Sequence, residues 1–188
     1  MRKIILLSIV LIPIVLSAQE KNLIPFQQNE KWGYADNQGR VVIRPQFSEA
    51  HNFSCGLARV EMGGVALTDP VVKSFVKMGF IDEEGHWVIQ SRFKYYFPYD
   101  FSEGLVPFRK LSKGWGYMDT KGKIVIGPRL QWAGNFAHGI APVLVDGGCA
   151  QIRQNGEIFN RGRSVPRNKA LQSHNGTFLS KHETPPCP

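Results

Sequence analysis

Short apolar runs bounded by Gly, Pro or Asp recur along this chain of 188 residues. Three of these runs are rich in β-branched residues, and each follows a polar segment that resembles a turn. Runs of this length and composition are typical of β-strands. They are Val41-Val42-Ile43, Trp87-Val88-Ile89 and Ile124-Val125-Ile126. The pattern predicts an all-β protein.

The polar segment before each β-branched run has a constant form, with Asp three positions before Gly. Asp at the first position and Gly at the fourth favour a type I turn, and Gly accepts the left-handed conformation that closes a short hairpin. We therefore interpret each segment as a hairpin turn, and each Asp as a turn residue rather than a catalytic acid. The pairs are Asp36 and Gly39, Asp82 and Gly85, and Asp119 and Gly122.

A triplet with Gly at its centre precedes each of these turns. In the third copy, the two-residue period of a strand puts Trp115, Tyr117 and Asp119 on one side and Gly116 and Met118 on the other. The first position of the triplet holds Trp, Met or Cys in different copies, and this interchange of apolar side chains indicates packing between repeats. The triplets are Trp32-Gly33-Tyr34, Met78-Gly79-Phe80 and Trp115-Gly116-Tyr117.

Pro45 and Pro128 follow the first and third β-branched runs. Because Pro cannot donate a backbone hydrogen bond, each is expected to end its strand or to lie on a sheet edge. A second phrase then begins with Phe and has Gly three positions later, before another apolar run. We interpret it as a turn entering a third strand, so about three short antiparallel strands are expected per repeat. The glycines of this phrase are Gly56, Gly104 and Gly139.

Two linked phrases that recur in one order make this a repeat protein. The first phrase and its strand, as in Lys31-Trp32-Gly33-Tyr34 through Arg40-Val41-Val42-Ile43-Arg44-Pro45, resemble the WG repeat family of bacterial proteins. Repeat two departs from that motif, with Met78 in the Trp position and Ser91 in the Pro position. The resemblance implies tandem β-repeats, and it implies no single activity because the family has none that is agreed.

The domain boundaries follow from these repeats. Residues 19–30 form a lead-in, and residues 31–160 form the repeat domain, whose last copy, residues 149–159, is degenerate. Insertions are expected around residues 63–77 and 94–100, and insertions in repeat arrays often gather on a binding face. Three and a half unequal repeats would close a ring poorly, so we expect an open, twisted, solenoid-like array, with a propeller-like closed array as the alternative.

The N-terminal segment has the form of a secretory signal peptide. Arg2 and Lys3 precede an apolar run, Ser17 and Ala18 follow it, and cleavage is expected after residue 18. The run is short for the ~20 residues that a membrane-spanning helix needs. The mature protein is therefore expected in the periplasm, the outer envelope or the extracellular space, with membrane contact only through the cleaved segment.

The net charge of +8 suggests a nucleic-acid partner, but the distribution of this charge along the chain does not support one. Much of the excess lies in residues 1–18 and 161–188, which leaves the repeat region close to neutral. No nucleic-acid partner is expected. Residues 161–188 are interpreted as a basic, disordered tail, although such a tail could also touch an anionic polymer.

The sequence contains few candidate catalytic, metal-binding or disulfide-forming residues. Cys55, Cys149 and Cys187 are odd in number and share no metal-ligand spacing, so they imply no disulfide framework, although one bridge is permitted. The histidines lack zinc-site spacing, and no nucleophile elbow or phosphate loop is present. No catalytic residue, metal or cofactor is expected, and the protein is interpreted as a non-enzyme.

The insertion at 94–100 holds an aromatic cluster that the repeat does not require. Aromatic side chains give a large contact area with few rotors, which suits both protein interfaces and sugar rings. The leading hypothesis is an exported, non-catalytic scaffold that binds an unknown protein partner. The alternatives are a glycan or peptidoglycan-binding module, which would stack sugars on Tyr95, Tyr96 or Trp132, and an envelope hydrolase. The candidate surface residues are Tyr95, Tyr96, Phe97, Tyr99 and Trp132.

Overall fold

The computed structural model describes residues 22–63, 77–91, 95–146, 148–159 and 187. All regular elements within these ranges are β-strands, as the sequence predicts. No helix in this part of the chain is long and apolar enough to cross a membrane. The signal peptide, most of the insertion at 63–77 and the tail up to residue 186 lie outside the described residues, so the expectations for them stay predictions.

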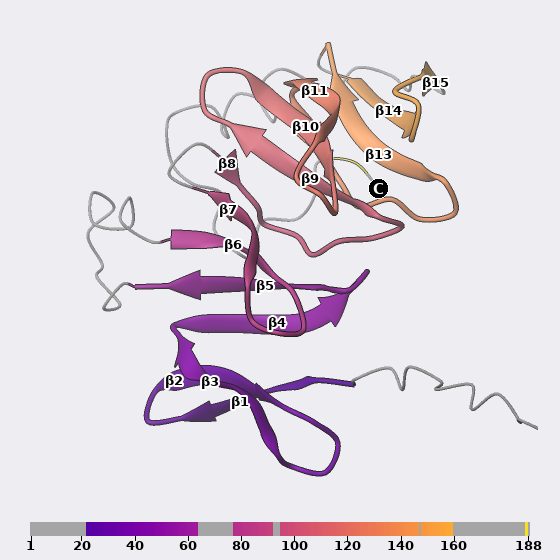
Figure 1. The fold of residues 1–188 in the computed structure, drawn as a ribbon. Coiled ribbons are helices and arrows are strands. Elements are labelled where there is room, and N and C mark those ends of the chain that lie inside the picture. The colour runs from indigo at the N-terminus through magenta and orange to yellow at the C-terminus, as the bar shows by residue number, and fades with distance from the viewer. Residues whose placement is uncertain (1–21, 64–76, 92–94, 147, 160–186, 188) are drawn as a thin grey trace, which may run out of the picture.

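The strands form four small antiparallel sheets that follow one another in chain order (Figure 1). The first sheet contains β1 (Ile24–Gln28), β2 (Lys31–Ala35) and β3 (Val41–Phe47). The second contains β4 (Glu49–Ser54), β5 (Leu57–Met62), β6 (Lys77–Ile81) and β7 (Trp87–Ser91). The third contains β8 (Tyr95–Tyr96), β9 (Leu105–Lys110), β10 (Gly114–Asp119) and β11 (Ile124–Leu130). The fourth contains β12 (Trp132–Ala133), β13 (Ile140–Val145), β14 (Gly148–Arg153) and β15 (Ile158–Phe159).

The sheets are out of phase with the sequence repeats. In the second sheet, β4 and β5 come from repeat one, whereas β6 and β7 form the first hairpin of repeat two, and β5 pairs with β6 from Ala58↔Ile81 to Met62↔Lys77. The third sheet is joined in the same way, through the pairing of β9 with β10. The structural unit therefore has four strands and crosses a repeat boundary, rather than three strands within one repeat. Backbone hydrogen bonds consequently connect consecutive repeats.

The second phrase contains a tight turn of its own. Cys55 and Gly56 have φ values of 53° and 77°, and positive φ at both central residues is the signature of a type I′ hairpin turn. The same pair of conformations occurs at Glu103-Gly104 and His138-Gly139. In repeat one this turn joins two strands, β4 and β5. The sequence reading missed β4 because its residues, Glu-Ala-His-Asn-Phe-Ser, lack a clear apolar alternation.

Three apolar layers lie between the four sheets. Residues of β9 alternate between two of these layers, because Leu105 belongs to the layer facing the fourth sheet, whereas Val106 and Phe108 belong to the layer facing the second. Strands buried on both faces read as continuous apolar runs. The layers contain Tyr34, Ile43, Val60 and Ile81; Leu57, Phe80, Val106 and Phe108; and Tyr117, Ile126, Val143 and Ile152, among others.

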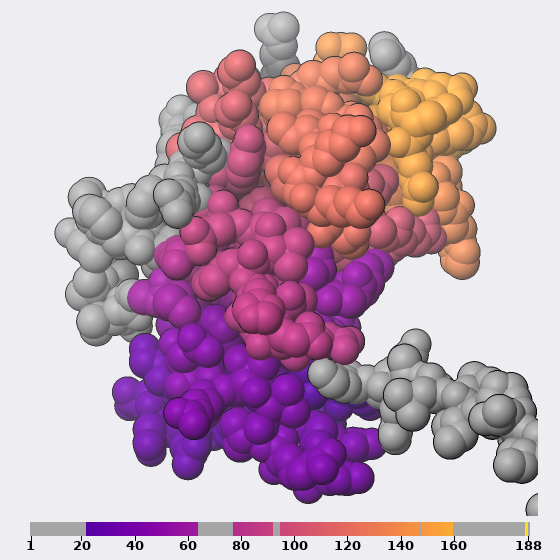
Figure 2. Space-filling view, in the orientation of Figure 1, coloured from indigo at the N-terminus to yellow at the C-terminus, as the bar shows by residue number. Residues whose placement is uncertain are grey.

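Successive first-phrase hairpins also stack directly on one another. A Cβ atom added to Gly85 would lie 3.3 Å from the Ile43 side chain, and one added to Gly122 would lie 3.4 Å from Ile89. The turn of each hairpin therefore rests on the isoleucine of the preceding one. None of the sheets closes on itself, and the stack forms an open array that runs from the first sheet to the fourth (Figures 1 and 2).

The central glycine of each triplet permits a close approach of two backbones. A Cβ atom on Gly33 would lie 2.5 Å from the carbonyl oxygen of Ile43, and one on Gly116 would lie 2.4 Å from that of Ile126. Gly79 is equivalent, with 2.0 Å to the carbonyl oxygen of Ile89. Contacts this short are not tolerated, so these positions accept no side chain without movement of the backbone.

Pro45 and Pro128 lie within β3 and β11, which are edge strands, as one of the two predicted placements requires. Each of these strands has a register shift beside its proline, between the pairs Tyr34↔Ile43 and Trp32↔Phe47 in β3 and between the equivalent pairs in β11. A bulge on an edge strand leaves residues unpaired, which suits Pro because it has no N–H to donate.

The predicted turns of the first phrase are present in all three copies. The carboxylate of Asp119 accepts hydrogen bonds from the backbone N–H groups of Lys121 (3.0 Å) and Lys123 (2.8 Å), and Gly122 has a φ of 80°. Asp36 and Asp82 accept equivalent pairs of hydrogen bonds. Each aspartate therefore stabilises its own turn.

Cys149 and Cys187 form a disulfide, with their Cα atoms 5.6 Å apart. This is the one bridge that the sequence permits but does not predict, because a sequence separation of 38 residues does not reveal that the two positions meet. The Cys187 side chain is buried in the third apolar layer. Residue 187 is therefore anchored to the fourth sheet, unlike the disordered terminus that the sequence suggested. Cys55 is free and exposed.

Candidate functional site

The structure corrects two members of the predicted aromatic surface. Phe97 has no exposed area and Trp132 is 6% exposed. Phe97 packs edge-on against Phe80, with ring centroids 5.2 Å apart, and Trp132 belongs to the third apolar layer. Their burial reflects the shared sheets, because residues 95–100 and β12 fill space between neighbouring repeats. These two rings are core residues and are unavailable to a ligand.

The three tyrosines of the same cluster are half-buried. Tyr95 packs on Phe108 and carries Lys110 over its ring, and Tyr99 packs on Trp115. Burial raises the pKa of both Tyr96 and Tyr99 above the usual tyrosine value. The cluster therefore serves largely to pack the third sheet against its neighbours, with Tyr95 against the second apolar layer and Tyr99 against the third, and only part of each tyrosine faces solvent.

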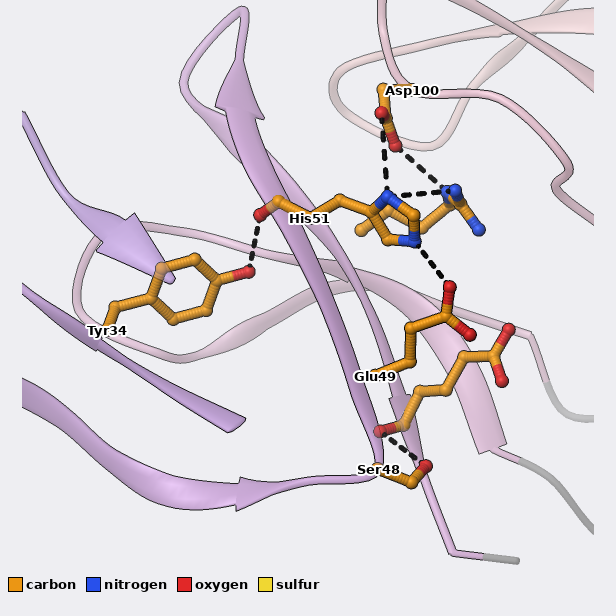
Figure 3. A network of polar contacts seen from close by, with 7 residues as sticks. Tyr34, Ser48, Glu49, His51 and Asp100 are labelled. Carbon is orange, nitrogen blue, oxygen red and sulfur yellow. Dashed lines mark hydrogen bonds and ion pairs between the residues drawn. The ribbon is translucent and has the colours of Figure 1, made fainter. Parts of the chain in front are cut away.

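A polar network lies beside this cluster, between repeats one and two (Figure 3). Its centre is Arg59 of β5, which is 6% exposed. The guanidinium Nε donates to Asp100 Oδ1 at 2.9 Å, and Nη2 donates to His51 Nδ1 at 3.2 Å. Asp100 lies between β8 and β9, so this buried cation ties β5 to the following repeat.

His51 is held between a cation and a carboxylate. Because Arg59 can only donate, Nδ1 of His51 must be the acceptor, and Nε2–H then donates to Glu49 Oε1 at 2.9 Å. Burial, followed by the Arg59 charge, lowers the pKa of His51 despite the opposing charges of Asp100 and Glu49. The backbone carbonyl of His51 also accepts from the hydroxyl of Tyr34 at 2.7 Å.

The arrangement of these side chains bears on whether the network could catalyse hydrolysis. Glu49, His51 and Asp100 are residue types that a hydrolase uses, and they come from two repeats. However, Arg59 occupies the ring nitrogen that would have to take a proton from a substrate, and Glu49 holds the other. The geometry is suited to fixing β4, β5 and the 98–100 segment relative to one another. The sequence analysis missed the network because Asp100 is far from Glu49, His51 and Arg59 in the sequence, and no motif links them.

A second set of contacts connects the type I′ turns along the array. The Ser54 hydroxyl donates to the carbonyl oxygen of Phe101 at 2.6 Å, and the Ser102 hydroxyl donates to that of Phe136 at 2.7 Å. The next residue of each turn accepts from the following turn glycine, since Gly104 N–H donates to Cys55 Sγ at 3.4 Å and Gly139 N–H donates to Glu103 Oε2 at 2.8 Å. The Phe-Ser pair that recurs in repeats one and two is the sequence feature from which these contacts could have been predicted.

Exposed aliphatic side chains recur at two neighbouring positions of three successive hairpins. They lie on the edge strands β3, β7 and β11, one or two residues before the buried isoleucine on which the next hairpin rests. The hairpins stack in register, so these side chains follow one side of the array. We name this set the aliphatic row; it consists of Val41 (53% exposed), Val42 (41%), Val88 (41%), Ile124 (38%) and Val125 (46%).

Neither the row nor the network has the composition of a metal centre. Within the described ranges, no three side chains of His, Cys, Asp or Glu come together in a way that could hold a metal ion. The network instead fixes how repeats one and two join, whereas the row is displayed on three successive hairpins.

Small stacked sheets, three of them with a close-approach glycine and the last three assembled across repeat boundaries, define a tandem β-repeat protein. The chain belongs to the WG containing repeat family, whose model matches residues 32–65, 78–113 and 115–149. No curated protein sequence matches the chain. Among solved structures, the computationally designed Ika8 protein aligns with 78% of this chain at 9% identity and a TM-score of 0.43, and the match spans about half of that designed chain, 48%.

Proposed function

We propose that this protein is an exported, non-catalytic scaffold that binds another protein in the cell envelope or outside the cell. The observation that carries the proposal is the aliphatic row, because it displays similar exposed apolar groups on three stacked, rigidly joined hairpins. Contiguous exposed apolar groups rimmed by polar residues are typical of interaction sites. Repeat arrays commonly use such extended surfaces for binding.

Two observations support export. The first 18 residues have the pattern of a signal peptide. The disulfide between Cys149 and Cys187 is of a kind that persists in oxidising compartments and is rare in the cytosol. The mature chain is therefore proposed to begin at Gln19 and to carry one thiol outside the disulfide, that of Cys55. Intact mass and thiol counting of the protein purified from the envelope fraction test both points.

The glycan-binding alternative loses much of its support. It depended on exposed aromatic rings, whereas Phe97 and Trp132 are buried and the tyrosines are half-buried. The hydrolase alternative depends on His51, and Arg59 and Glu49 occupy its two ring nitrogens. The scaffold is the function that the exposed groups support best.

A photo-crosslinking amino acid in place of Val88 tests the scaffold proposal in the full-length, exported protein. Val88 lies in the middle of the aliphatic row, and the matched control position is Leu111, which is 64% exposed on the turn between β9 and β10. The proposal predicts one defined protein adduct from position 88 and none from position 111. The absence of a protein adduct from both positions, or the same adducts from both, would contradict the proposal.

A further inference from the structure

The surroundings of the aliphatic row indicate what kind of partner it fits. The edge strands β3 and β11 contain no acidic residue. Arg44 and Lys123 are exposed next to the row, and Arg129 is exposed further along β11, where its guanidinium donates to the carbonyl oxygen of Gly156 at 3.3 Å. Within the described residues, none of the three side chains forms an ion pair with a carboxylate. Repeat two differs, since its turn carries Glu83 and Glu84. The row is therefore basic at its two ends and acidic near its centre.

The spacing along the row favours a helix. Stacked sheets pack about 10 Å apart, so the exposed residues of successive hairpins recur at about that interval. Seven residues of an α-helix rise about 10.5 Å. Side chains one heptad apart on a helix therefore match successive hairpins, whereas side chains on one face of an extended strand recur about every 6.6 Å.

The edges themselves oppose strand addition. β3 and β11 each carry a proline and register shifts, and both features protect a sheet edge from pairing with another strand. The row also lacks the Trp, Phe and Leu that helices use to enter a membrane surface. A side-chain contact with a helix fits these edges better than either alternative.

Resting on the proposed function, we propose that the aliphatic row binds an amphipathic α-helix of the partner protein. The helix carries two aliphatic side chains per heptad over three heptads, with acidic residues flanking the first and third. Its aliphatic side chains pack on Val41 and Val42, on Val88, and on Ile124 and Val125. Its acidic residues face Arg44 at one end and Lys123 and Arg129 at the other. Charge complementarity of this kind determines the register of an interface and excludes wrong partners.

Model peptides test this proposal on the mature full-length protein. The probe is a helical peptide of about 21 residues, three heptads, with Leu at two positions per heptad and Glu flanking the first and third pairs. The matched peptide has Lys in place of each Glu, and the third probe is a phosphatidylglycerol vesicle. We expect the acidic peptide to bind at least about tenfold more tightly than the basic one, with salt weakening the binding.

Variants assign the binding to the row. Arg44→Glu combined with Lys123→Glu should reverse the preference between the two peptides, and Val42→Ser combined with Val125→Ser should weaken both interactions. Leu111→Ser is the control and should change neither. All these side chains are exposed, and an unchanged thermal midpoint confirms folding.

The outcomes distinguish failure of the acidic-helix proposal from failure of the scaffold proposal. Binding of vesicles alone, equal binding of both peptides, or no binding of either would overturn the proposal of an acidic helix. In each of these cases, a defined protein adduct from position 88 would still support the scaffold. Absence of that adduct together with absence of peptide binding would reject both.

Discussion

Repeats one and three share a geometry that repeat two lacks. In β3 and β11, two residues are bulged out next to Pro45 and Pro128, so Trp32 faces Phe47 and Trp115 faces Leu130. In β7 the register is continuous at the equivalent place, and Met78 faces Ser91 directly. The difference coincides with the replacement of Pro by Ser. The proline position of the motif is therefore associated with the bulge, and the repeat can be built without it.

In repeat two, Ser91 changes the path that the chain takes after its edge strand, β7. It is 2% exposed, its hydroxyl donates to the carbonyl oxygen of Tyr95, and its oxygen accepts from Tyr95 N–H at 3.1 Å. The chain thereby reaches β8 and the aromatic segment that follows. A single replacement in the motif thus accompanies the insertion at 94–100.

The joints between repeats differ in the same way. Repeats one and two meet through the charges of Arg59, Asp100 and His51. The position of Arg59 is taken by Pro107 in repeat two, where the next joint is formed by aromatic packing of Tyr99 on Trp115. The first joint is therefore the one expected to respond to pH.

The largest expected effect concerns the last sheet, where the Trp position of the motif holds Cys149. Cys149→Ser removes a cross-link over 38 residues, and the entropy of the closed loop corresponds to about 4 kcal/mol of unfolding free energy. Chemical denaturation of the oxidised protein measures this loss. Cys55→Ser is the control and should have little effect, because Cys55 forms no disulfide and a Ser oxygen at this exposed position can also accept from Gly104 N–H. Equal stability of the Cys149 variant and the wild type would show that the cross-link contributes nothing.

The next effect tests the feature that all three complete repeats share. Gly116→Ala should cost about 3 kcal/mol or more, because its Cβ would lie 2.4 Å from a backbone oxygen. Gly127→Ala, with no atom within 4 Å of its Cβ, is the control and should cost less than about 1 kcal/mol. Thermal denaturation compares the two. Similar losses for both would contradict the close approach.

The third residue of the triplet is a tyrosine in repeats one and three but Phe80 in repeat two, so only the first and third repeats have a hydroxyl at this position. Tyr117 donates to the carbonyl oxygen of Gly134 at 2.8 Å in a buried site, and Tyr34 donates to that of His51 in a partly buried one. Tyr117→Phe should cost about 1–3 kcal/mol because it leaves a buried carbonyl unsatisfied, and Tyr34→Phe should cost less. Urea denaturation measures both, and the reverse order would argue against the role of burial.

Ser91→Ala sharpens the comparison at repeat two. It should cost about 1 kcal/mol, since the two hydrogen bonds to the Tyr95 backbone are lost at a buried position. Ser112→Ala removes an exposed hydroxyl that contacts only a local carbonyl and is the control. A Ser91 variant as stable as the Ser112 variant would mean that the exit from β7 does not depend on this side chain.

The smallest effect is the pH response of the first joint. The pKa of His51 is lowered from 6.5 in the folded state, so the unfolded chain binds more protons and stability falls as the pH drops below about 6.5. Glu49, Arg59 and Asp100 face the imidazole from β4, β5 and the 98–100 segment. His51→Gln should flatten this part of the stability profile. A wild-type profile identical to that of the variant would contradict the lowered pKa.

The sequence predicts the local hairpins well because their turns depend on single residues. Asp119 and Gly122 specify their turn through their own hydrogen bonds and conformation, wherever the hairpin lies in the fold. The shared sheets were not predicted in the same way, because the sequence pattern was divided at the repeat boundaries. In the second sheet, the pairing of β5 with β6 also connects segments that a long insertion separates. The burial of Phe97 and Trp132 and the bridge between Cys149 and Cys187 depend on that assembly, so sequence reasoning misplaced the first two and missed the third.

The central claim is that each inner sheet is assembled from two consecutive repeats. Nuclear Overhauser contacts between backbone protons test it most directly in the full-length protein. The account predicts cross-strand contacts between Ala58 and Ile81 and between Val106 and Met118, which join repeat one to two and two to three. Contacts that instead pair β5 with β2 or β3 of its own repeat, with none between β5 and β6, would contradict it.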